Sequence, residues 1–242
     1  MTFSENEIQS PEIQSPEIPS TEVETPPLWQ VRALDRSLAD TRARSVARLS
    51  QFVAAARSLA EETGSSAFTV QQVVARSGQS LKGFYRYFEG KDDLLLALLE
   101  EDIAVGAMFL RELIDAHDEP VDRIREWLDG LFELMSAGDE GYVSVLVRES
   151  QRLAETRPDL LDVAVAPFLE LLATELERGV ESGAVRRADA RRDAHLVFQI
   201  TLGTIHDLVS GRDQRPPDEV VAYLWEFCWG GLRAPKKSGR ST

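Results

Sequence analysis

The segment TVQQVVARSGQSLKGFYRYFEGKDDLL, which runs from Thr69 to Leu95, gathers cationic and aromatic side chains in a chain that is otherwise acidic. Lysine and arginine neutralise phosphate groups, and a tyrosine hydroxyl offers a directional hydrogen bond to one. Lys82, Tyr85 and Arg86 lie close together within it. They could form an ordinary solvated surface, but their joint placement on one short segment favours the binding of a phosphate backbone.

The charge of the chain is unevenly distributed around this segment. The formal net charge is −14, and residues 1–31 hold six acids and no base. Residues 32–91 hold ten Lys or Arg against five acids, so this part alone is positive. A local positive face attracts a polyanion even when the whole molecule is acidic.

Composition and motifs argue against other classes of protein. The single cysteine, Cys228, excludes an internal disulfide framework, and no secretory leader is visible. Glu100, Glu101 and Asp102 interrupt the most apolar run, so we expect no membrane span and a soluble, cytoplasmic protein. The three histidines are not clustered, and GxSxG, P-loop and GxGxxG motifs are absent. We therefore expect no enzyme activity, no metal and no cofactor.

The basic segment starts with a short helix that has clear ends. Thr69 and Gln72 have the T-x-x-Q spacing of a capping box, which satisfies backbone amides at a helix start. Gly78 suits the left-handed turn that ends a helix. The sequence therefore predicts a helix from Thr69 to about Ser77.

A second short helix follows across this tight turn. Ser80 can cap a helix over residues 81–88, on which Phe84 and Phe88 are one turn apart and face inward. The cationic and tyrosine side chains then project outward. Two short helices joined by a glycine turn, the second one basic, are typical of a helix-turn-helix that reads the major groove.

The stretch FTVQQVVARSGQSLKGFYRYFEGKDDLL resembles the DNA-binding signature of the tetracycline-repressor (TetR/AcrR) family. The resemblance covers roughly residues 42–100 and rests on the Thr-started helix, the turn glycine and YRYF followed by lysine and an acidic helix start. It implies an all-α homodimer with an N-terminal three-helix DNA-binding domain. A larger C-terminal helical domain would bind a small effector and dimerise.

The resemblance also implies roles for individual residues. Tyr85, Tyr87 and Lys91 fall at phosphate-contacting positions of the family. Gln71, Leu81, Lys82 and Gly83 fall where the family approaches base edges of double-stranded operator DNA. The candidate DNA-binding set is completed by Thr69, Ser80, Arg42 and Arg44.

Two positions depart from the family pattern. Gln79 stands where an apolar residue is usual, and the recognition helix starts Ser-Leu-Lys-Gly instead of Ser-Lys-Gly-Thr. Leu81 therefore either compensates in the core or reaches a thymine methyl group. Gly83 weakens the helix but leaves room for close approach to the duplex, and we favour the second role.

The chain divides into four parts. Residues 1–35 are predicted to be a disordered, acidic, proline-rich leader that is either an inert tail or a docking segment. Residues 36–91 form the DNA-binding domain, with the helix-turn-helix at about 69–88. Residues 92–232 form the effector-binding and dimerisation domain, and residues 233–242 form a disordered tail.

The predicted effector pocket lies in this larger domain. Pro167 interrupts a helical pattern over residues 158–181, and a kinked helix against a buried one leaves an opening. The alternative is a filled core. The candidate pocket residues are Trp127, Phe132, Met135, Leu146, Phe168 and Leu172.

The last two predicted helices, over residues 189–210 and 217–232, carry apolar faces suited to a four-helix dimer interface. We therefore expect a ligand-responsive transcriptional regulator, a repressor released from operator DNA by an unidentified hydrophobic or acyl-type effector. The alternative is a non-sensing DNA-binding, architectural or protein-interaction module whose helical body only dimerises.

Overall fold

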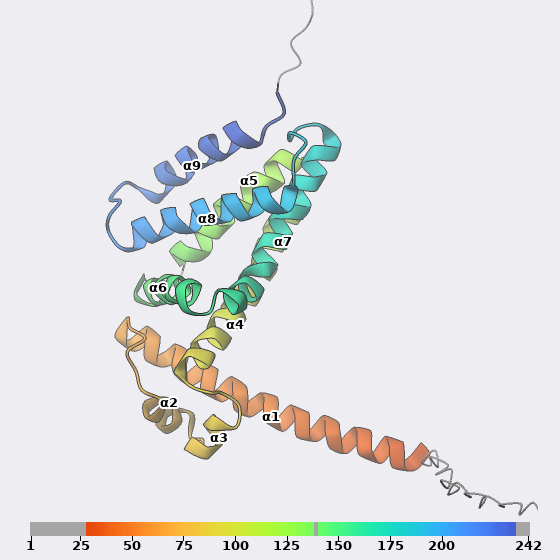
Figure 1. Cartoon of the computed structure of the whole chain (residues 1–242), viewed down its shortest axis with the longest axis vertical. Helices are drawn as coiled ribbons and strands as arrows, with labels where there is room; N and C mark the ends of the chain where they lie inside the picture. The colour runs from red at the N-terminus through yellow and green to blue at the C-terminus, as the bar shows by residue number, and fades with distance from the viewer. Residues whose placement is uncertain (1–27, 138–139, 236–242) are drawn as a thin grey trace, which may run out of the picture. The chain divides into compact units, whose positions relative to one another are not determined.

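The computed structural model describes residues 28–137 and 140–235, and the described chain is all-α. Apart from one β-bridge between Val185 and Arg233, these residues form helices and their connections (Figure 1). The predicted fold class is confirmed. The helices are α1 (Leu28–Thr63), α2 (Val70–Ser77), α3 (Leu81–Tyr85), α4 (Lys91–Asp115), α5 (Pro120–Ala137), α6 (Glu140–Thr156), α7 (Pro158–Ser182), α8 (Ala190–Val209) and α9 (Pro217–Leu232).

The described ends of the chain differ from the predicted boundaries. Helix α1 begins at Leu28, so residues 28–35 are helical and do not belong to a disordered leader. Pro27 is the last proline before Pro120, and the helix starts directly after it. At the other end, the amide of Ala234 donates to the Ala184 carbonyl at 2.8 Å, which orders the start of the predicted tail. The rest of the leader and tail lies outside the described residues.

Residues up to Arg44 and residues from Ser45 onward form two compact units, and each is described by itself. In the second unit, an aromatic core holds the C-terminal part of α1 against α2 and α3. The Phe52 ring contacts Phe84 and Phe88 edge to face, at centroid distances of 5.5 and 6.1 Å. Phe68 and Val73 are buried in the same core.

The turn between α2 and α3 has the predicted chemistry. Thr69 and Gln72 form the capping box, and Gly78 has φ of 67°, which is the left-handed region. Ser80 caps α3 by accepting from the Gly83 amide at 3.0 Å. Helix α3 ends at Tyr85, three residues earlier than predicted, and a turn carries the chain to Phe88.

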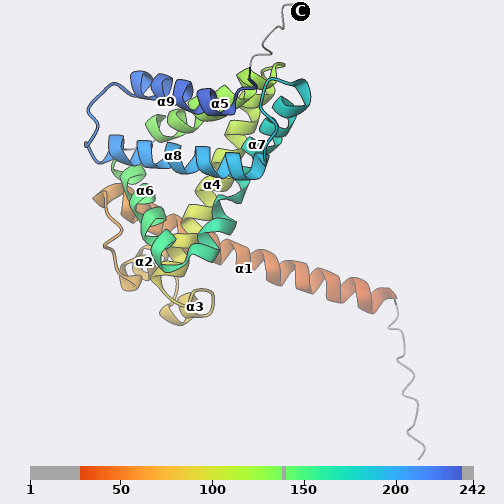
Figure 2. The same ribbon diagram turned by 45° about the horizontal axis from the view of Figure 1, so that its top comes forward.

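Helix α4 belongs to two cores. Leu94, Leu95 and Leu98 pack in the aromatic core with α1, α2 and α3. Leu99 and Ile103 pack in a larger core formed with α5 to α9. In that larger domain, α8 and α9 lie side by side (Figures 1 and 2). The predicted division between residues 91 and 92 therefore falls at the start of a helix that both cores share.

Candidate DNA interface and apolar cavity

The outer face of α3 presents polar and cationic groups to solvent. Lys82 and Arg86 are exposed, and the Tyr85 side chain is 57 % exposed. The Tyr85 ring contacts the buried Phe84 ring edge to face, with the ring centroids 5.3 Å apart. This contact restricts the position of the Tyr85 ring and therefore of its hydroxyl. Leu81 is 43 % exposed, which places it on the surface and leaves it available to a thymine methyl group.

Tyr87 and Arg86 form a local pair beside this face. The Arg86 guanidinium lies over the Tyr87 ring at 4.6 Å, and its Nη2 donates to the Tyr87 hydroxyl at 2.5 Å. A hydrogen bond with Ser45, assisted by Arg86, lowers the pKa of Tyr87. Arg48, Lys82 and Arg86 line one concave surface together with Tyr85 and Tyr87. A concave surface with several cations and two phenols suits a phosphate backbone.

Lys91 is half-buried and has a structural partner. Its Nζ donates to the Ser66 carbonyl at 2.6 Å and lies 5.4 Å from the centre of the Phe68 ring. The ammonium group therefore fastens the start of α4 to the loop before α2. Two of its three protons remain for another acceptor.

The other candidate contacts divide by environment. Thr69 caps α2, and Gln71 is exposed on that helix. At Gly83, an added Cβ would lie 3.1 Å from the Ser80 hydroxyl, so crowding within the first turn of α3 also accounts for glycine there. Arg42 and Arg44 are exposed on the separately described part of α1, where Arg44 Nε donates to the Asp40 carbonyl at 3.2 Å.

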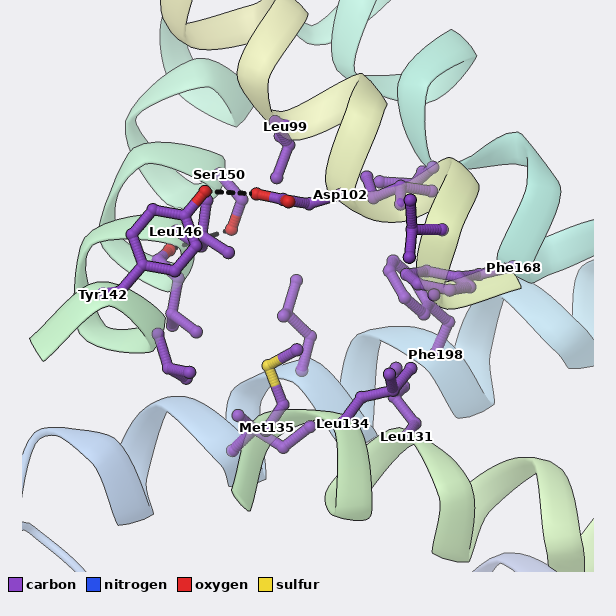
Figure 3. Close-up of a pocket in the computed structure, with 18 residues that line it drawn as sticks. Leu99, Asp102, Leu131, Leu134, Met135, Tyr142, Leu146, Ser150, Phe168 and Phe198 are labelled. Atoms are coloured by element: carbon purple, nitrogen blue, oxygen red, sulfur yellow. Dashed lines mark hydrogen bonds between the residues drawn. The ribbon is translucent and has the colours of Figure 1, made fainter. Parts of the chain in front are cut away.

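An apolar cavity of about 250 Å³ lies among α4, α5, α6, α7 and α8 (Figure 3). Of the predicted pocket residues, Met135, Leu146 and Phe168 line it, and Phe132 lines a second cavity. Trp127 and Leu172 are fully buried away from its wall. The Trp127 indole donates to the Phe168 carbonyl at 3.1 Å, so this residue is a satisfied core residue.

Polar groups gather at one end of the cavity. Asp102 of α4 accepts from the Tyr142 hydroxyl of α6 at 2.5 Å (Figure 3). Arg57 of α1 pairs with the same carboxylate and donates to the Tyr142 hydroxyl at 2.8 Å. Burial raises the pKa of Tyr142, with a further contribution from Asp102, so the phenol stays protonated at neutral pH.

This polar cluster was not predicted from the sequence. The signal was Asp102 itself, an acid within a long apolar run, which we used only to exclude a membrane span. Its partners are 45 and 40 residues away in the chain, and nothing in the local pattern pairs them. The cluster places a side chain of the DNA-binding domain within reach of the cavity wall.

A second set of contacts joins α6 to the loop before α2. Arg148 Nη2 donates to the Gly64 carbonyl at 3.0 Å, and the Ser66 hydroxyl donates to Glu149 at 2.6 Å. Arg152 also pairs with Asp92 at the start of α4, at 2.9 Å. Because α6 lines the cavity through Leu146 and Val147, its position links the cavity to the DNA-binding domain.

None of the helices in residues 28–137 and 140–235 is long and apolar enough to cross a bilayer. What these residues do form is a capped helix-turn-helix on a helical body that contains an apolar cavity. This arrangement defines the class of helix-turn-helix transcriptional regulators.

Comparison with known proteins shows what the chain is similar to. Residues 52–98 match the sequence model of the bacterial regulatory proteins of the tetR family. The chain is 25 % identical over 161 residues to the fatty acid metabolism regulator protein of Bacillus subtilis, covering 66 % of this chain and 80 % of that protein. It is 24 % identical over 192 residues to the transcriptional activator FasR of Mycolicibacterium smegmatis, covering 76 % and 83 %.

Solved structures share the fold. FadR from Bacillus subtilis in complex with stearoyl-CoA aligns with a TM-score of 0.63 at 20 % identity, covering 76 % of this chain and 98 % of that one. FadR from Bacillus halodurans gives 0.62 at 20 % identity, covering 76 % and 99 %. The protein is a ligand-responsive, DNA-binding transcriptional regulator, and its residues 52–98 match the model of the tetR family.

Proposed function

We infer that the protein is a cytoplasmic, homodimeric repressor that leaves its operator when a hydrophobic effector with a long acyl chain fills the apolar cavity. The proposal rests on the observation that α4 packs in both hydrophobic cores. Its first two turns pack in the DNA-binding core, and Leu99, Asp102, Ile103, Val105 and Gly106 of the same helix line the cavity. A ligand that shifts α4 therefore acts on the helix-turn-helix directly.

The DNA contacts proposed here are the groups that α2 and α3 present to solvent. We propose that Lys82 and the Tyr85 hydroxyl contact phosphates and that Leu81 and Gln71 contact base edges, and all four residues are exposed. Tyr87 and Lys91 are held by partners of their own, and each keeps hydrogen-bonding capacity for a phosphate. Arg42 and Arg44 complete the proposed set.

Two-fold pairing would supply the second recognition helix. Helices α8 and α9 expose Leu196, Ile200, Tyr223 and Phe227, and the last two are 68 % and 64 % exposed. Each pair is spaced by four residues, so each makes a stripe on its helix. Two such helices from each of two protomers make the four-helix interface that we propose.

The chemistry of the cavity supports a hydrocarbon chain as its occupant. Among the described residues that line the cavity, the polar ones are Asp102, Tyr142 and Ser150, and the others are apolar. Ser150 already donates to the Val147 carbonyl at 2.8 Å. The similar protein of Bacillus subtilis is named as a fatty acid metabolism regulator, and one of the similar structures holds stearoyl-CoA.

The contacts at the cavity edge suggest how binding is transmitted. Leu146 lines the cavity and packs against both cores, and Asp102 joins the cavity wall to Arg57. A ligand changes the operator affinity only if it binds the DNA-incompetent arrangement more tightly. We propose that the acyl chain favours a position of α4 and α6 in which the two recognition helices no longer match the half-sites.

A binding measurement on duplexes selected from genomic DNA by the full-length protein tests this function. Stearoyl-CoA should lower the operator affinity by roughly 5- to 150-fold, the range of ordinary allosteric coupling, and coenzyme A alone should not. If stearoyl-CoA binds the protein and the operator affinity stays constant, the body is a dimerisation module without a sensing role.

A further inference from the structure

A second cavity adjoins the first one. It has a volume of about 300 Å³. The residues that line this cavity but not the first one are Phe132, Leu208, Val209 and Pro217. Met135, Val143 and Ile205 line both cavities, so these three side chains form the partition. The described side chains that line the second cavity are all apolar, so they can contact the far end of a hydrocarbon chain.

The three residues of the partition differ in how easily they move. Val143 and Ile205 are buried and β-branched, and β-branched side chains on helices are restricted to one preferred rotamer. Met135 is partly buried, and an unbranched thioether side chain has three rotatable bonds. It lies in the last turn of α5. Met135 is therefore the movable member of the partition.

The direction of the partition matches an extended ligand. Figure 3 shows Met135 on the side of the first cavity opposite Asp102, Tyr142 and Ser150. A chain whose polar end lies near Asp102 and Tyr142 would therefore direct its methyl end toward Met135.

We propose that Met135 is a gate between the two cavities and that it determines the longest acyl chain that the protein accepts. Short chains end in the first cavity, and longer chains displace the Met135 side chain and enter the second cavity. Met135 is thus a specificity-determining residue. This inference rests on the proposed function, because it takes the first cavity as the site of an acyl chain.

Three variants of the full-length protein test the gate by calorimetric titration with decanoyl-, myristoyl- and stearoyl-CoA. In the wild-type protein, affinity should rise by roughly fourfold for each methylene group that becomes buried. Met135→Ile puts a stiff side chain of similar size in the partition, so it should bind decanoyl-CoA as the wild type does and lose most of the gain from myristoyl to stearoyl. Met135→Ala removes the movable side chain of the partition, so it should increase that gain several-fold. Met135→Leu, which keeps an unbranched β-carbon, should stay close to the wild type.

The outcomes separate the gate from the proposed function. If the Ile and Ala variants both keep the wild-type dependence on chain length, Met135 is not a gate, and the assignment of the first cavity stands. If none of the three acyl thioesters binds the wild-type protein, the acyl-effector function itself fails, and the gate fails with it. Should Met135→Ile not fold, as judged by circular dichroism and melting, the Ala variant alone decides.

Discussion

At the residue scale, the cations of the DNA-binding domain differ in how strongly the protein itself holds them. Arg76 pairs with Glu62, with Nη2 donating to Oε2 at 2.7 Å, and Lys91 donates to the Ser66 carbonyl. Lys82 is exposed on α3. Arg76 already has an acidic partner and therefore gains less from a phosphate, so the basic segment contains fewer DNA-binding charges than its composition indicates.

Lys82→Ala should weaken binding to specific and random duplexes alike. The slope of log affinity against log salt should become less negative by about one unit, because one fewer counterion is released. Fluorescence anisotropy over a salt series measures both quantities. Arg76→Ala is the matched control, since its charge is paired with Glu62. An equal change of slope in the two variants would contradict the assignment of Lys82 to a phosphate.

Tyr85→Phe should weaken operator binding by about tenfold, which is the order expected for a hydrogen bond to a charged phosphate. The ring contact with Phe84 remains, so the denaturant midpoint of unfolding should not change. Operator titration and urea unfolding on the same preparation check the two parts. Unchanged operator affinity would remove the Tyr85 hydroxyl from the phosphate contacts.

At the element scale, α4 connects the two functions because its first two turns pack in one core and its later turns pack in the other. The glycines along the α4–α5 and α4–α7 contacts show how closely these helices pack. At Gly106, an added Cβ would lie 3.0 Å from the Phe168 ring and 3.2 Å from Leu134, both on the cavity wall. At Gly130 it would lie 2.7 Å from Leu110, away from the cavity.

These two glycines allow a matched test of the cavity. Gly106→Ala should reduce the affinity for stearoyl-CoA, because the added methyl group displaces side chains that line the cavity. The operator affinity without effector should stay the same as in the wild type. Gly130→Ala should instead lower the free energy of unfolding by about 1–3 kcal/mol through overpacking and leave the ligand affinity of the folded protein unchanged. Calorimetric titration and denaturant unfolding distinguish them. A loss of ligand affinity in Gly130→Ala alone would place the ligand elsewhere.

Local signals predicted the elements better than they predicted the cavity. Capping residues, prolines and the periodicity of apolar residues located α2 and α7 to α9 to within about two residues, because these signals act within a few positions. Trp127 and Met135 carry the same apolar signal in the sequence, yet one is sealed in the core and the other lines a cavity. Only the packing of helices distant in the chain separates them, and the Arg57–Asp102–Tyr142 cluster depends on the same packing.

At the scale of the whole molecule, operator selectivity requires two recognition helices at a fixed spacing. One module contacts few bases, and pairing two subunits multiplies the discrimination. The exposed apolar stripes of α8 and α9 provide the surface that we propose for this pairing. Effector binding then lowers the operator affinity if it changes only the separation of the two recognition helices.

Phe227→Lys should convert the dimer into monomers and weaken operator binding, because it places a charge in the proposed apolar interface. Sedimentation velocity measures the first effect and anisotropy the second. Val163→Lys on α7 is the matched control, since Val163 is 68 % exposed and lies outside α8 and α9. A Phe227→Lys protein that remains dimeric would contradict the proposed interface.

The most direct test of the account is the binding of purified full-length protein to duplex DNA, with and without stearoyl-CoA. At low ionic strength, we expect binding to duplexes of any sequence and selection from genomic fragments of a two-fold symmetric site, from which stearoyl-CoA releases the protein. A protein that ignores every duplex at low ionic strength would contradict the central claim that α3 reads DNA.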